Sequence, residues 1–177
     1  RDLGTQLREE EDALIIEQSD PNQRKLLATL AVHTNGALVY GHSLGQQRTR
    51  ARDMLDLWVV DEDEVERVLR AFLAYANNGV GNMAQNQLIA NVYLGVSLSG
   101  IENKFFGRYP ATDPDRMTLP DHRLGDSLHI PQPLERVSRA HLADPATLAR
   151  RTSDAIARKF RLAGAYFTPY YRTRNQR

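Results

Sequence analysis

The sequence contains no cysteine, which excludes disulfide bonds, thiolate nucleophiles and cysteine-ligated metal sites. It also lacks any apolar run approaching the roughly 18 to 20 residues that span a bilayer. Its N-terminus does not show the charged-then-apolar pattern of a secretion signal. These absences predict a soluble chain without membrane insertion. They leave the compartment open, with the cytoplasm or a virion favoured over secretion.

Lysine is scarce. Among the 23 basic residues only Lys25, Lys104 and Lys159 are lysines, and the rest are arginines. Arginine makes planar, bidentate contacts with phosphate and carboxylate, although a GC-rich genome produces the same bias. The charge is uneven: residues 1–130 hold 13 Lys+Arg against 19 Asp+Glu, and residues 131–177 hold 10 against 3. The chain is therefore an acid-leaning body with a strongly basic last quarter, a pattern that suits an anionic partner or contact between copies.

A length of 177 residues predicts one domain spanning 1–177, and the periodicity of its apolar residues predicts an all-α fold. We expect a bundle of about six or seven helices. The helices are expected over residues 3–18, 21–34, 46–58, 61–76, 88–96 and 145–163.

Local signals support several of these helix boundaries. Ser19-Asp20-Pro21 is a capping side chain followed by proline, and Asn35-Gly36 is a stop signal. Asp61 is a cap before an inward-facing stripe that ends at Asn77-Asn78-Gly79, and Trp58 is the expected core anchor of the preceding helix. The four apolar residues 37–40 are compatible with a strand but too few to decide it.

The 31 residues between Arg70 and Glu102 carry no charge. A helix there is expected to be either the central helix of the domain, which we favour, or a subunit contact, because interface cores are depleted of charge. The predicted interface residues are Leu88, Val92, Tyr93, Val96, Phe105 and Phe106. Residues 107–133 hold five of the eight prolines and predict a long irregular loop.

No metal site or cofactor is predicted. The acidic residues that follow Asp61 suit the first turn of a helix, where the dipole favours negative charge. A calcium loop starting there would need glycine at its sixth position, where Glu66 stands. The carboxylates and histidines of residues 107–133 have no recognisable ligand spacing.

The basic segment 145–177 is expected to be a helix, capped at Asp144-Pro145, followed by a tail. On a helical wheel four arginines fall on one outer arc, with Asp154 in its middle. The arginines, together with aromatic and basic tail residues, predict a nucleic-acid surface that holds phosphates and stacks bases. Its residues are Arg150, Arg151, Arg158, Arg161, Tyr170, Tyr171, Arg172 and Arg174.

Two other interpretations of this segment stay open. In one, Arg150, Asp154 and Arg158 form a ladder of surface ion pairs and the tail is merely solvated. In the other, the tail aromatics dock on a neighbouring subunit while the arginines meet its acidic surface.

Gly41-His42-Ser43-Leu44-Gly45 matches G-x-S-x-G and follows a strand-like run. It resembles the nucleophile elbow of the α/β-hydrolases, which implies Ser43 as nucleophile on a sharp strand-to-helix turn. The acids and histidines that could follow it in triad order are Asp113, Asp115, Asp121, Asp126, His129 and His141. Only 42 residues precede Ser43, which leaves little room for the strands that come before the elbow in that family.

Taken together, these features predict a non-enzymatic structural subunit that assembles with itself and binds RNA or DNA, as nucleoproteins and helical capsid proteins do. The alternatives are a protein-protein scaffold subunit of a larger complex and, third, a serine hydrolase using Ser43.

Overall fold

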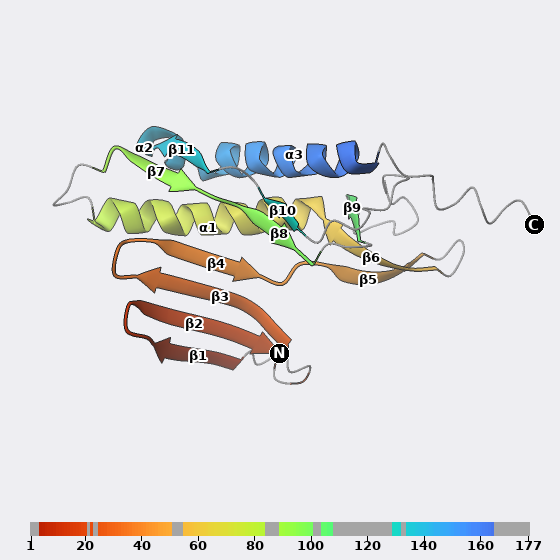
Figure 1. The fold of residues 1–177 in the computed structure, drawn as a ribbon, viewed down its shortest axis with the longest axis horizontal. Coiled ribbons are helices and arrows are strands. Elements are labelled where there is room, and N and C mark those ends of the chain that lie inside the picture. Colours follow the sequence, from red (N-terminus) through yellow and green to blue (C-terminus); the bar gives the residue numbers. More distant parts are fainter. Residues whose placement is uncertain are drawn as a thin grey trace, which may run out of the picture. The chain divides into compact units, whose positions relative to one another are not determined.

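The computed structural model describes residues 4–20, 22, 25–50, 55–83, 89–100, 104–107, 129–131 and 134–164. The fold is mixed, with eleven strands and three helices among the described residues (Figure 1). The predicted all-α bundle of six or seven helices is therefore wrong. The chain forms two compact units, residues 1–43 (unit 1) and residues 44–177 (unit 2).

Unit 1 is a four-stranded antiparallel sheet in which each strand pairs with the next along the chain (Figure 1). Its strands are β1 (Gly4–Glu9), β2 (Ala13–Asp20), β3 (Lys25–His33) and β4 (Leu38–His42).

The turn between β3 and β4 is fixed by Asn35 and Gly36. The His33 N–H donates to the Ala37 carbonyl at 2.9 Å, closing a three-residue loop. Gly36 has φ +85°, a backbone conformation that disfavours residues with a Cβ, and the Asn35 side chain accepts from the Ala37 N–H at 2.9 Å. The residues predicted to stop a helix thus form a hairpin turn.

The strand register places most large apolar side chains of unit 1 on one face, because residues paired directly across antiparallel strands share a face. Two neighbouring rows cross the sheet: Leu7, Ile16, Leu30 and Tyr40, and Leu14, Val32 and Leu38. We call these seven residues the apolar face. The opposite face carries the buried Ala13 and Ile15 beside charged side chains.

Unit 2 combines two long helices with short sheets. The pairings are antiparallel for β5 with β6, β7 with β11 and β8 with β10, and parallel for β6 with β9. The strands are β5 (Gln46–Arg50), β6 (Leu55–Asp61), β7 (Asn91–Leu94), β8 (Ser97–Ser99), β9 (Phe105–Gly107), β10 (His129–Pro131) and β11 (Glu135–Ser138). The helices are α1 (Glu62–Met83), α2 (Arg139–Leu142) and α3 (Pro145–Gly164).

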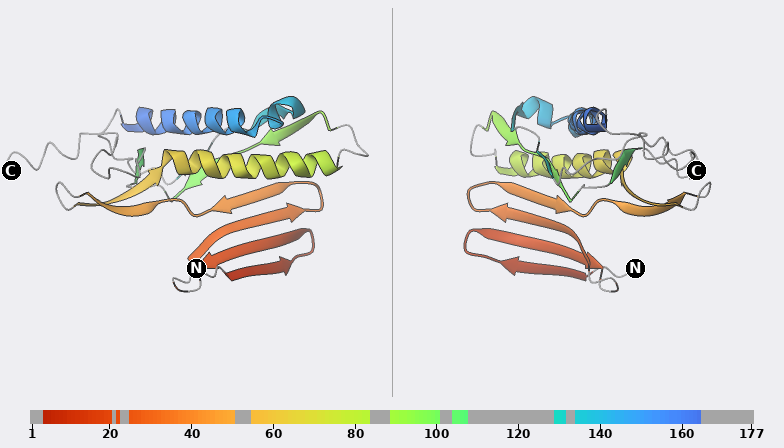
Figure 2. Two further views of the ribbon diagram at one scale, coloured as in Figure 1. Left: turned by 180° about the vertical axis from the view of Figure 1, so that it is seen from behind. Right: turned by 45° about the vertical axis from the view of Figure 1, so that its right-hand side comes forward.

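Helices α1 and α3 run side by side and hold the core of unit 2 (Figure 2). Val65, Leu69 and Leu73 recur every four residues along α1, so they share one buried face. The buried stripe of α3 contains small residues at the same spacing, Ala149, Ser153 and Ala157. Small side chains allow two helix backbones to approach closely, which explains this pairing.

The predicted start of α1 is confirmed. The Asp61 carboxylate accepts from the Asp63 N–H at 3.0 Å, as an N-cap does. Burial raises the pKa of Asp61, the Asp63 hydrogen bond lowers it, and the neighbouring Asp63 and Glu64 charges raise it. The helix runs to Met83, past the predicted stop at Asn77.

The other predicted helices N-terminal to residue 97 are wrong. Residues 3–18 and 21–34 supply β1, β2 and β3, and residues 46–58 supply β5 and most of β6. Trp58, the expected core anchor, is 48% exposed. In the charge-free stretch, β7 replaces the helix predicted over 88–96. Pairing between strands has overridden the local helical spacing of leucines.

Among the described residues, no helix is long and apolar enough to cross a membrane.

Candidate nucleic-acid interface

Helix α3 begins where the sequence predicted. The Asp144 carboxylate accepts from the Thr147 N–H at 3.2 Å, and Pro145 occupies the first helical position. Hydrogen bonds from the Thr147 side chain and backbone lower the pKa of Asp144. The cap stays ionised at neutral pH and fixes the start of the helix.

The apolar spacing of residues 145–163 predicts Leu148, Ala155, Ile156 and Phe160 on the inner face of this helix. In the structure Leu148 and Ile156 are almost fully buried and Ala155 is partly buried, while the Phe160 side chain lies outside the described residues. Arg150, Arg151 and Arg158 are exposed on the other side of the helix. We call these three residues the arginine face. Arg161 lies on α3 at a position that falls on the same arc, but its side chain is outside the described part of the structure.

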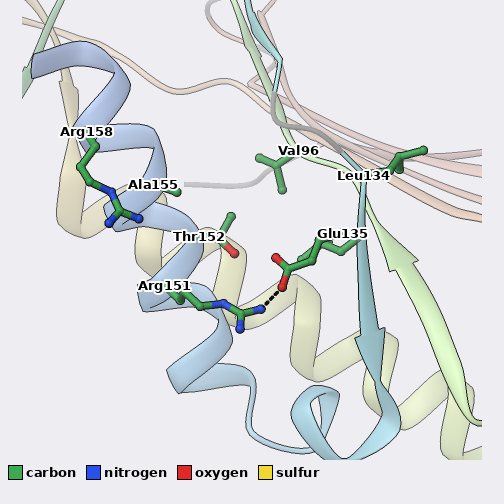
Figure 3. Close-up of a pocket in the computed structure, with 8 residues that line it drawn as sticks. Val96, Leu134, Glu135, Arg151, Thr152, Ala155 and Arg158 are labelled. Atoms are coloured by element: carbon green, nitrogen blue, oxygen red, sulfur yellow. Dashed lines mark hydrogen bonds and ion pairs between the residues drawn. The ribbon is translucent and has the colours of Figure 1, made fainter. Parts of the chain in front are cut away.

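One member of the arginine face is already paired. The Arg151 guanidinium donates to the Glu135 carboxylate of β11, and both side chains are about half exposed (Figure 3). The partners are 16 residues apart and on different elements. Sequence reasoning missed Glu135, whose only signal is that it alternates with the buried Val137 on a short strand.

A hollow of about 440 Å³ lies between α3 and the β7–β11 pair (Figure 3). Arg151, Arg158 and Glu135 supply its charged groups, and the Thr152 hydroxyl beside them donates to the Leu148 carbonyl at 2.9 Å. Its apolar lining residues are Leu94, Val96, Leu134 and Ala155. The arrangement offers a shallow recess with an apolar lining and guanidinium groups beside it.

The ladder of Arg150, Asp154 and Arg158, which was the alternative interpretation of this helix face, is not formed. Among the residues that the structure describes, no carboxylate lies within ion-pair distance of Arg150 or Arg158. Two guanidinium groups of the arginine face are thus open to an external anion, while Asp154 remains exposed on the same side.

An exposed arginine and an exposed tyrosine also lie side by side on the β7–β11 pair. Tyr93 and Arg136 are directly opposite in the register, and both are exposed, Tyr93 by 72%. The alternation of a strand places them on the face opposite Leu94 and Glu135. Sequence reasoning assigned Tyr93 to an interface and missed Arg136.

The remaining predicted interface residues have varied positions. Val92 and Val96 pack, partly buried, against the core of unit 2, and Phe106 is inside that core at 4% exposure. Leu88 and the side chain of Phe105 lie outside the described residues, as do the tail residues Tyr170, Tyr171, Arg172 and Arg174.

The loop predicted over 107–133 falls mostly outside the described residues as well. Its described part includes β10, which pairs with β8. No group of three or more histidine, aspartate or glutamate side chains that could hold a metal occurs in the described parts of the chain.

The surroundings of Ser43 differ from those of a nucleophile elbow. Ser43 follows β4, as the motif requires, but the next element is the strand β5 and not a helix. Its backbone N–H donates to the Leu27 carbonyl at 2.8 Å, which continues the β3–β4 pairing. The strand-to-helix turn on which the resemblance depended is absent from this segment.

No known protein family, no curated protein and no solved structure matches this chain.

Proposed function

We propose that the chain is a non-enzymatic assembly subunit that binds nucleic acid through the arginine face of α3. The observation that carries this proposal is the exposure of Arg150 and Arg158 without a carboxylate partner among the described residues. Both project from a capped helix whose other side is packed, so their positions need little ordering on binding.

The chemistry of the arginine face suits phosphate. Guanidinium groups make charge-assisted, bidentate contacts with phosphate oxygens. Successive arginines along one helix face present several such groups to a polyanion, which gains more from them than a single anion does. The apolar hollow beside the arginine face adds a surface for the non-phosphate part of a nucleotide.

The carboxylates of this region limit the expected affinity. Asp154 lies among the arginines and Glu135 holds Arg151, so the described surface engages about two phosphates. Duplex DNA then gives a slope of about −1.8 in a plot of log affinity against log salt concentration. The tail residues Tyr170, Tyr171, Arg172 and Arg174 would add contacts to this minimum.

The test is the affinity of the full chain for labelled DNA and RNA at low salt, measured by fluorescence polarisation. Arg150→Gln/Arg158→Gln should flatten the salt slope by about 1.8. A matched control is Arg67→Gln/Arg70→Gln, which removes two exposed arginines from α1 and should leave the slope unchanged. Absence of binding at low salt, or equal effects of the two double variants, would overturn the proposal.

A further inference from the structure

The outer edge of β1 is open. β1 is the first strand of the unit 1 sheet, and no other described strand pairs with its outer side. All its residues after Gly4 are exposed, and it contains no proline or inserted residue that would interrupt pairing. Such an edge presents a row of backbone donors and acceptors to another chain. We infer that β1 pairs antiparallel with β1 of a second copy.

The β1–β2 hairpin determines which backbone groups point outward. The Glu10 N–H donates to the Ala13 carbonyl at 2.8 Å, immediately beyond the pair Glu9 and Leu14. Hydrogen-bonded and non-hydrogen-bonded pairs alternate along an antiparallel ladder. The N–H and C=O groups of Thr5, Leu7 and Glu9 therefore point away from β2, toward the open edge.

These outward groups are centred on Leu7, which fixes the register of the pairing. A two-fold axis at Leu7 places Leu7 opposite Leu7 of the second copy and Thr5 opposite Glu9. About six backbone hydrogen bonds result, more than in a register shifted by two residues. The axis is perpendicular to the sheet, so both apolar faces lie on the same side.

The side chains of β1 fit this register. Leu7 is 69% exposed although its neighbour across the ladder is the apolar Ile16. Pairing covers its open flank with a second leucine and joins the two apolar faces into one continuous surface. This pairing explains why Leu7, the most exposed leucine of the apolar face, lies on the edge strand.

Charge also favours a second copy as the partner. Arg8 points to the opposite face, where its guanidinium lies 3.2 Å from the Glu10 carboxylate and 3.7 Å from that of Glu17. In the paired sheet Arg8 lies opposite Gln6, and Glu9 lies opposite Thr5. No two like charges meet across the new ladder, so the strand is complementary to itself.

This pairing rests on the assembly part of the proposed function and not on nucleic-acid binding. Its test contains no nucleic acid. The two can therefore fail separately. The pairing buries little area, so the dimer is expected to be weak and dependent on concentration.

The test is sedimentation velocity of the full chain over a dilution series. Wild type should pass from dimer to monomer on dilution. Leu7→Lys and Leu7→Glu should each be monomeric, because like charges would meet at the two-fold axis. An equimolar mixture of the two variants should recover the dimer, because the lysine introduced in one copy then faces the glutamate introduced in the other.

Val39→Lys is the matched control, since Val39 is an exposed apolar strand residue, 55% exposed, on β4. This variant should dimerise like wild type. Recovery in the mixture also shows that both variants are folded. A monomeric wild type at the highest concentration, dimeric Leu7 variants, or a mixture that stays monomeric overturns the inference.

Discussion

Replacing Glu135 by glutamine is expected to strengthen nucleic-acid binding and to make it more sensitive to salt. In the structure the Glu135 carboxylate accepts from Arg151, so the ion pair as a whole presents no net charge to an incoming phosphate. The ion pair is exposed and contributes little to folding, about 0 to 1 kcal/mol. Glutamine keeps the shape of the side chain and removes the competing charge, which leaves Arg151 open to a third phosphate.

The size of the effect follows from the number of phosphates. For duplex DNA each phosphate contributes about 0.9 to the salt slope, so two phosphates weaken binding about 12-fold between 50 and 200 mM salt, and three about 40-fold. Phosphate contacts made by other arginines add equally to the salt slopes of wild type and of Glu135→Gln. The loss of affinity over this range is therefore about 3.5-fold greater for Glu135→Gln than for wild type, whatever the tail contributes.

Polarisation titrations of a labelled duplex at several salt concentrations measure this difference. Glu66→Gln on α1 makes the same charge change away from the arginine face and should steepen the salt dependence of binding much less than Glu135→Gln does. Adding Arg151→Gln to Glu135→Gln should return the slope to that of wild type. An unchanged slope in Glu135→Gln, or an equal rise in Glu66→Gln, would refute the assignment of Arg151 to phosphate.

Further predictions, at three positions, concern stability. Asp61→Ala should lower the free energy of unfolding by about 1 kcal/mol because the cap of α1 is lost, whereas Asp61→Asn keeps an acceptor and should not. Because the pKa of Asp61 is raised in the folded protein, this residue contributes stability at pH values below 3.8, its ordinary pKa, and the contribution is lost as the pH rises through the raised pKa. Measuring the free energy of unfolding against pH should show that Asp61→Asn removes this contribution. Ser153→Ala should raise the melting temperature, because the buried Ser153 hydroxyl has no hydrogen-bond partner among the described residues, and a lower melting temperature would contradict this. Gly36→Ala should destabilise the β3–β4 turn by about 1 kcal/mol in denaturant unfolding, whereas Gly41→Ala, where φ is not positive and a Cβ meets nothing, should cost less.

Helix signals succeeded where capping chemistry and burial agreed. Asp61 and Asp144 each precede a long stripe of apolar residues, and each caps a helix in the structure. The outer arc of α3 could be predicted from the sequence for the same reason, because a helix that packs on one side leaves its other side exposed. The arginine face was accordingly predictable.

Leucine spacing alone misled the interpretation of unit 1. The leucines of residues 3–18 and 25–33 fit a helical period, but these segments pair as strands. Asn35-Gly36 between two apolar runs is a strong hairpin signal, and its interpretation as a helix stop caused part of the error. Pairing between strands is a tertiary effect, and short apolar runs do not reveal it.

The ion pair between Glu135 and Arg151 could not be predicted from the sequence, because it also depends on tertiary packing. Glu135 meets Arg151 only because β11 and α3 both pack on the core of unit 2. Neither residue type nor spacing identifies that contact, whereas Asp154, four residues from both Arg150 and Arg158, suggested a ladder that does not form.

Nucleic-acid binding is tested most directly by the native mass of the full chain at low salt, with and without a short oligonucleotide. The mass should increase by that of the bound oligonucleotide, and Arg150→Gln/Arg158→Gln should weaken this increase. A mass that does not change on addition of either DNA or RNA would contradict the proposal that the arginine face binds nucleic acid.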